Sequence, residues 1–341
     1  MPTEAEERWN KDGTVLRDAI IAAGYEAELT FAQDKIEQQN ADIENAIVKG
    51  AKIIVIGAKD GSAVGPAVEK AREAGIKVIA YDRLIMDTDA VDYYVTFQLE
   101  KVGELEANYV IEKLGLDKGE KGPFNIEVFT GSSDDNNAKF FFKGAWELLQ
   151  PYFASGVLVS PSGKVTADFT VDNWQDISID SWKMENAQRE MESRLAKYNG
   201  GETPLHAVLS PYDGISQGVI NAIETSGMPW KAGTENWPWI TGQDATNYAL
   251  YNINMGTQGE TVWKDTRVLA TKVAEICVQI LKGETVATDA TMNNNNIEVP
   301  SVLLDSVSVT KNGASDAKDT QSVQDVVDSG YTTEDQVKPY E

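Results

Sequence analysis

The first third of the chain alternates between two hydrophobic periodicities. Segments 12–24, 34–50 and 62–75 carry apolar residues at helical spacing, and each ends at a glycine. Segment 26–31 alternates between polar and apolar residues, segment 52–57 is a short apolar run rich in β-branched residues, and segment 77–81 is again short and apolar, so all three are expected to be strands. Strands that alternate with helices indicate βαβ units, in which helices cover both faces of a parallel sheet.

The alternation continues through the middle of the chain. The pattern predicts strands at 124–131, 206–210, 238–242 and 258–263, and helices at 136–149, 183–198, 215–227 and 264–283. In the tail, 298–310 is strand-like, 311–321 is loop-like and 322–330 is a short helix. These are too many strands for one ordinary doubly wound sheet. We therefore predict two α/β lobes, with the Gly- and Lys-rich stretch 114–123 as a crossing between them.

Polar side chains follow five of the predicted strands. In open α/β sheets the ligand lies outside the carboxyl ends of the strands, so these turns are expected to meet at one cleft. The five clusters are Asp82-Arg83, Asp134 to Asn137 (with Asp135 and Asn136 between them), Asp213, Gln243-Asp244 and Lys264-Asp265.

The residue types in these turns match a polyol. Each sugar hydroxyl donates one hydrogen bond and accepts others, and charged side chains make the stronger bonds. Trp9 and Trp182 flank polar stretches and could stack on the apolar face of a sugar ring. Each single cluster has an ordinary alternative as a helix cap or a structural ion pair. The recurrence of both charge signs in both halves favours ligand binding.

Composition excludes several classes of function. The chain has 30 basic and 54 acidic residues, a formal net charge of −24, which argues against nucleic acid and anionic lipid as partners. One histidine, His206, and one cysteine, Cys277, argue against a zinc site and a Cys/His or Ser/His catalytic pair. We expect both to be structural. The acidic stretch 172–180 lacks the glycine of an EF-hand loop, so calcium binding there is an alternative with weak support. We predict no metal and no cofactor.

Several of these motifs occur together in a known family. ITGQDA, AYDRLI, SPYDG, SSDDNNAKFFF and WKDTR resemble the periplasmic monosaccharide-binding proteins of ABC importers, in the branch of multiple-sugar-binding and xylose-binding proteins. The resemblance covers nearly the whole chain. It implies a type I periplasmic-binding fold, with two doubly wound parallel-sheet lobes joined by a three-segment hinge. The N-terminal lobe is expected to comprise 1–118 and 247–285, and the C-terminal lobe 119–246 and 286–341.

The resemblance also implies which residues contact the sugar. A monosaccharide such as glucose, galactose, xylose or arabinose is expected between lobes that close on it. The segment around Trp182 lacks a basic residue that the family pattern leads us to expect. The implied contacts are Arg8, Trp9, Asp82, Arg83, Asp135, Asn136, Asn137, Trp182, Asp213, Asp244 and Lys264.

Further expectations follow from the same resemblance. The protein would be a monomer without enzymatic activity, and it would deliver sugar to the membrane subunits of an ABC transporter. It would lie in a periplasm, or outside a Gram-positive cell on a lipid anchor. Family members carry an apolar strand before the first loop, so the chain numbered from Met1 is expected either to lack that strand or to be numbered late.

Three other functions fit parts of the sequence. The sugar-loaded protein could bind a sensor-kinase ectodomain in a signalling role. A sugar-responsive repressor shares the fold, but it needs a helix-turn-helix segment, which is absent here, and the charge of −24 opposes DNA binding. A carbohydrate-active enzyme could use Asp134 or Asp213, but nothing marks a nucleophile.

The binding hypothesis makes a prediction for Asp244. We expect Asp244→Ala to abolish stabilisation by sugar while leaving the melting temperature of the unliganded protein nearly unchanged.

Overall fold

The computed structural model describes residues 1–313 and 320–338, so part of the predicted loop 311–321 lies outside the described residues. The chain forms two compact units. Unit 1 comprises Met1–Gln98, Asp134–Asn137 and Asp265–Asp305, and unit 2 comprises Leu99–Ser133, Ala138–Lys264 and Ser306–Glu341. These divisions differ from the predicted crossings near 118, 246 and 286. One reason is that residues 99–113, which the predicted boundary at 118 assigns to the first lobe, form helix α4 (Leu99–Lys113), which was not predicted and which packs on strands β6, β8 and β11 of unit 2.

Unit 1 contains a five-stranded sheet of order β1-β2-β3-β10-β9. Its strands are β1 (Ile53–Ile56), β2 (Lys77–Tyr81), β3 (Tyr93–Phe97), β10 (Glu298–Leu304) and β9 (Ala290–Asn293). The β1–β2, β2–β3 and β3–β10 pairs are parallel, and the β10–β9 pair is antiparallel. The sheet is therefore parallel apart from one edge strand.

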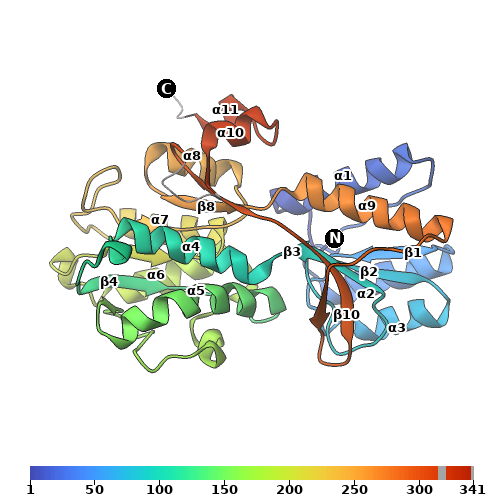
Figure 1. Cartoon of the computed structure of the whole chain (residues 1–341), viewed down its shortest axis with the longest axis horizontal. Coiled ribbons are helices and arrows are strands. Elements are labelled where there is room, and N and C mark those ends of the chain that lie inside the picture. Colours follow the sequence, from blue (N-terminus) through green and yellow to red (C-terminus); the bar gives the residue numbers. More distant parts are fainter. Residues whose placement is uncertain (314–319, 339–341) are drawn as a thin grey trace. The chain divides into compact units, whose positions relative to one another are not determined.

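Both faces of this sheet are buried, as a parallel sheet requires. Along β2, Val78 and Ala80 belong to one hydrophobic core, whereas Ile79 and Tyr81 belong to another. Because successive side chains of a strand point to opposite faces, the two cores lie on opposite sides of the sheet. Helices α2 (Ile36–Val48) and α3 (Gly65–Glu73) cover the first core, and α1 (Glu7–Ala22) and α9 (Thr266–Lys282) lie side by side over the second (Figure 1).

Unit 2 contains two sheets. The first has order β5-β4-β6-β7 and is parallel throughout, with β4 (Phe124–Val128), β5 (Leu158–Val159), β6 (Ala207–Leu209) and β7 (Trp239–Ile240). The second has order β12-β11-β8, from β8 (Glu260–Trp263), β11 (Val307–Thr310) and β12 (Thr320–Ser322). Besides α4, the helices of unit 2 are α5 (Asn136–Ala154), α6 (Met184–Leu195), α7 (Asp213–Thr225), α8 (Asn247–Met255), α10 (Val323–Asp328) and α11 (Glu334–Val337). The first two residues of α5 belong to unit 1.

The structure confirms most of the predicted elements and the two-lobe α/β class. Helix α8 was missed because it is only nine residues long and three asparagines interrupt its apolar pattern. His206 lies beside β6, where its Nδ1 accepts the backbone N–H of Asn125 at 2.8 Å, and Cys277 is buried in α9. Both are therefore structural, as predicted. Among residues 1–313 and 320–338, no helix is long and apolar enough to cross a membrane.

The strand predicted at 26–31 is wrong, because these residues form no ladder with the sheet. Strand β1 is the last strand on that side. A cavity of about 800 Å³ lies along its free edge, lined by residues 25–30, 53–56 and parts of α1, α2 and α9. A segment with strand propensity forms a strand only when it has a hydrogen-bonding partner. Here the cavity occupies the place beside β1 where a pairing strand would lie.

Met1 lines this cavity and pairs with the backbone of residues 30 and 32. Its N–H group donates to the carbonyl of Thr30 at 2.9 Å, and its carbonyl accepts from Ala32 N–H at 3.0 Å. This exchange with the residues on either side of position 31 is the pattern of a parallel ladder. Burial lowers the pKa of the Met1 amino group to about 6, because a charged amine is poorly solvated there.

We expect an apolar, β-branched segment of about six residues, fused before Met1, to pair with β1 and fill the cavity. The Met1 nitrogen would then be an amide, which keeps its donor without its charge. The free energy of unfolding, measured by urea denaturation, should rise by roughly 2 kcal/mol, allowing for the ordering of the added residues. A Gly/Ser segment of equal length is the control. Equal stability of the two fusions would contradict the pairing.

Candidate functional site

In unit 1 the polar cluster begins where β2 ends. Asp82 has a φ of 61°, in the left-handed region that is costly for residues other than glycine. Its backbone carbonyl accepts three hydrogen bonds, from Tyr94 Oη (2.8 Å), Thr96 Oγ1 (3.0 Å) and Asn137 Nδ2 (2.7 Å). Such a conformation persists only where the surroundings over-determine it. The three donors therefore fix the direction in which the Asp82 side chain leaves the strand.

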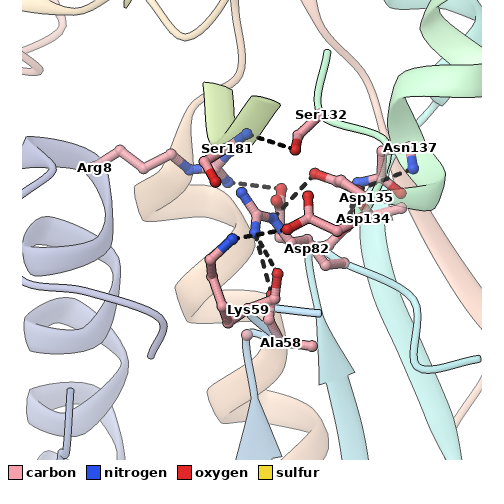
Figure 2. Close-up of polar contacts among 12 residues, drawn as sticks. Arg8, Ala58, Lys59, Asp82, Ser132, Asp134, Asp135, Asn137 and Ser181 are labelled. Carbon is pink, nitrogen blue, oxygen red and sulfur yellow. Dashed lines mark hydrogen bonds and ion pairs between the residues drawn. The ribbon is translucent and has the colours of Figure 1, made fainter. Parts of the chain in front are cut away.

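The Asp82 carboxylate is paired with Arg8 of α1. Arg8 Nη2 lies 2.6 Å from Asp82 Oδ1, and both side chains are almost fully buried (Figure 2). The neighbouring Trp9 is only 2% exposed, and its ring centroid lies 4.6 Å from the Arg8 guanidinium carbon and 5.2 Å from that of Arg83. Cation–π contacts of this kind hold guanidinium groups in place. Trp9 therefore orients two arginines.

Arg83 makes the second buried ion pair of unit 1. Its Nε lies 3.0 Å from Asp135 Oδ2, and its Nη1 donates to the carbonyls of Ala58 and Lys59, each at 3.3 Å. Burial raises the pKa of Asp135, and the charge of Arg83 opposes this shift. Asp135 Oδ1 also accepts from the backbone N–H of Asn137 at 3.0 Å, so the carboxylate caps α5 as well.

Lys59 is a member of the cluster that the sequence analysis missed. Its Nζ lies 2.8 Å from Asp134 Oδ2 (Figure 2). The signal was present, since Lys59-Asp60 follows the strand predicted at 52–57 just as Asp82-Arg83 follows the next strand. Asn136, also predicted, is the first residue of α5, and its buried Nδ2 has no hydrogen-bond partner among the described residues.

In unit 2 the central pair is Asp244 and Lys264. Lys264 Nζ lies 2.9 Å from Asp244 Oδ1, and the side chains are 3% and 5% exposed respectively. The ammonium also lies 5.4 Å from the ring centroid of Phe141. Asp244 and Ala245 have φ values of 95° and 48°, so this turn, like the one at Asp82, is held in a costly conformation.

Asp213 is occupied by donors of its own unit. Oδ1 accepts from Gln258 Nε2 (2.9 Å) and Thr261 Oγ1 (2.8 Å), and Oδ2 accepts from the backbone N–H (2.8 Å) and Oγ1 (3.0 Å) of Thr246. Burial raises the pKa of Asp213 to about 7, and these hydrogen bonds oppose the shift. Two of these four donors belong to Thr246, two residues after Asp244, so Asp213 supports the turn that carries Asp244.

Trp182 packs in a close-fitting place. A Cβ on Gly131 would lie 1.9 Å from Trp182 Cη2, so only glycine fits beside the indole. Phe141 and Tyr212 meet the ring edge-on at 6.5 and 5.8 Å between centroids. The buried Nε1 has no hydrogen-bond partner among the described residues and is available to donate to a ligand. Its neighbour Ser181 donates its backbone N–H to Ser132 Oγ at 2.8 Å (Figure 2).

The predicted residues thus form one cluster in each unit. Within residues 1–313 and 320–338, no group of three or more His, Cys, Asp or Glu side chains could hold a metal ion. Unit 1 gathers Arg8, Trp9, Asp82, Arg83, Asp135, Asn136 and Asn137, and unit 2 gathers Trp182, Asp213, Asp244 and Lys264.

Comparison with known proteins identifies the family. The family model described as "Periplasmic binding protein domain" matches residues 1–285, most of the chain. The chain belongs to the periplasmic binding protein family. It is 42% identical to the multiple sugar-binding periplasmic protein SbpA of Azospirillum brasilense, over 99% of this chain and 90% of SbpA. It is 35% identical to the D-xylose-binding periplasmic protein of Escherichia coli K12, over 91% and 85% of the two chains.

A solved member of this family has the same fold. The ABC transporter solute-binding protein from Clostridium phytofermentans, solved with bound β-D-glucose, superposes with a TM-score of 0.87 at 39% identity. The superposition covers 99% of this chain and 98% of that one. The two-lobe fold and the family resemblance are thereby confirmed.

The geometry changes the prediction for Asp244→Ala. Removing one partner of a buried ion pair leaves the other charge uncompensated, at a cost of about 3–5 kcal/mol. We now expect the variant to lower the free energy of unfolding by about that amount in urea denaturation, besides losing sugar binding. Glu28→Ala breaks the exposed pair with Lys49 and is the control, expected to cost less than about 1 kcal/mol. A loss for Asp244→Ala as small as the control's would contradict the buried pair.

Proposed function

We propose that this protein is the sugar-binding component of an ABC importer and that the two clusters contact a monosaccharide. The observation that carries the proposal is the set of three buried ion pairs at strand ends: Arg8–Asp82, Arg83–Asp135 and Lys264–Asp244. Each pair offers donors and acceptors side by side, and charged groups make the strongest hydrogen bonds to hydroxyls.

The charge balance of these pairs favours a neutral ligand. Each cation has a carboxylate within ion-pair distance, so no anionic or cationic ligand is needed to compensate a buried charge. A neutral polyol can take one oxygen of each carboxylate and one N–H of each cation without removing the charge balance. The relatives support this choice, since SbpA is named for binding multiple sugars and the Clostridium protein holds β-D-glucose.

Contacts from both units are what would couple binding to closure. A ligand shifts a conformational equilibrium only through its differential affinity for the two states. A sugar held by Arg83 and by Lys264 favours a closed form, which the importer's membrane subunits can then recognise. Micromolar binding needs about 8 kcal/mol, or roughly 0.7 kcal/mol for each of about a dozen sugar heavy atoms, well below the known ceiling.

Partner and location follow from the family. The curated relatives SbpA and the xylose-binding protein are named as periplasmic, and we place this protein in the same role as a monomer serving membrane subunits. A sensor-kinase ectodomain is the alternative partner. Sugar-dependent binding to a purified kinase ectodomain would favour that alternative.

A thermal-shift panel of pentoses and hexoses tests the proposal directly. An aldose present at 100 times its dissociation constant should stabilise the protein by about 2.7 kcal/mol, and the melting temperature should rise accordingly. Sugar alcohols of equal size, which lack the ring, are the controls. Negligible shifts with every aldose would reject sugar binding.

Trp182→Phe probes the unit 2 contact. It removes the indole N–H, which has no hydrogen-bond partner among the described residues, and keeps an aromatic ring. We expect the dissociation constant for sugar, measured by calorimetry, to rise about tenfold, as for the loss of one good hydrogen bond. Trp230→Phe, at a second buried indole that packs edge-on against Tyr198, is the matched control and should leave affinity nearly unchanged. Equal affinities of the two variants would remove Trp182 from the site.

A further inference from the structure

Asp12 lies one helical turn after Arg8 on α1 and is fully buried. Arg8 Nη2 is 3.6 Å from Asp12 Oδ2 and 2.6 Å from Asp82 Oδ1. The same guanidinium nitrogen therefore lies at hydrogen-bond distance from Asp82 and at ion-pair distance from Asp12. Neither the sequence motifs nor the family resemblance singled out Asp12.

We propose that Asp12 is a positioning residue for monosaccharide binding, which holds the Arg8 guanidinium while the Asp82 carboxylate also accepts a hydrogen bond from a sugar hydroxyl. This inference rests on the proposed function. A hydroxyl is neutral and cannot replace the charge that Asp82 presents to Arg8. A buried guanidinium that loses its carboxylate is strongly destabilised. Asp12 adds a second compensating charge next to Arg8 when Asp82 shares its carboxylate between Arg8 and the sugar.

Four groups from neighbouring segments face the Asp12 carboxylate. They are Arg8 on α1, Tyr81 at the end of β2, Asp82 after it and Thr266 at the start of α9. Burial raises the pKa of Asp12 to about 6, with Arg8 and the hydroxyls of Thr266 and Tyr81 opposing the shift and Asp82 adding to it. Asp12 is thus ionised at neutral pH.

Because the pKa of Asp12 is raised in the folded protein, its ionised form costs folding free energy. The folded state binds more protons than the unfolded state between the ordinary value of 3.8 and about 6. The stability associated with this group is present at low pH and is lost as pH rises through about 6. Asp12→Asn removes the buried charge, so this variant should melt at a higher temperature than the wild type at pH 8. A residue that only stabilised the fold would show the opposite sign.

Calorimetric titration with the most stabilising aldose of the panel, D-glucose first, tests the role between pH 5 and 8. We expect Asp12→Asn to raise the dissociation constant about tenfold at pH 8, the equivalent of one pKa unit of interaction. The ratio of dissociation constants, variant to wild type, should fall toward one at pH 5, where Asp12 is protonated and resembles asparagine. Asp18→Asn, at an exposed carboxylate of the same helix that pairs with Arg17, is the control and should stay within about twofold.

A ratio that stays at one, or that is the same at every pH, would overturn the positioning role. If Asp12→Asn fails to fold, Thr266→Val serves instead. It removes a hydroxyl that favours the ionised carboxylate, so the pH at which affinity falls should move upward, and an unmoved pH would overturn the role. If the wild type bound no aldose, the proposed function itself would be overturned. If the wild type bound an aldose and Asp12→Asn bound it equally well at every pH, only the role of Asp12 would be overturned.

Discussion

A buried charge needs a counter-charge inside the protein, and this constraint governs the polar clusters of both units. Removing an ion from water costs several kcal/mol, which a partner offsets only at close range and with good geometry. Arg83 meets this condition through Asp135 at 3.0 Å, and Lys264 through Asp244 at 2.9 Å. The pairs therefore present donors and acceptors at defined positions without a ligand. Preorganisation of this kind lowers the cost of binding.

The fold holds these charges at the ends of strands. Asp82 and Asp244 each follow a strand in a left-handed conformation, and each turn is braced by its own unit. Three side chains donate to the Asp82 carbonyl, while Asp213, with four donors, supports the turn that carries Asp244. Strain at a functional turn persists only with such support. The residues that brace these two turns therefore help to hold the ion pairs at the strand ends in place.

Much of this arrangement could be predicted from the sequence, because the carboxyl ends of parallel strands gather their turns at one edge of a sheet. That rule located Asp82, Arg83, Asp135 and Asp244. It could not show that Asp213 supports the turn at Asp244, since the donors to Asp213 lie 33 to 48 residues further along the chain. Asp12 escaped notice because a single acid inside an amphipathic helix gives no signal until its burial is known. The strand predicted at 26–31 was wrong because a strand needs a neighbouring strand to pair with, and the propensity of a segment does not show whether such a neighbour is present.

The central claim is that one neutral sugar ring is held by buried ion pairs from both units. A crystal structure of the protein grown with D-glucose tests it most directly. We predict one monosaccharide with ring or hydroxyl oxygens within hydrogen-bond distance of both Arg83 and Lys264, with Asp135 and Asp244 still next to them. A sugar bound elsewhere, or one that touches the residues of a single unit, would contradict the account.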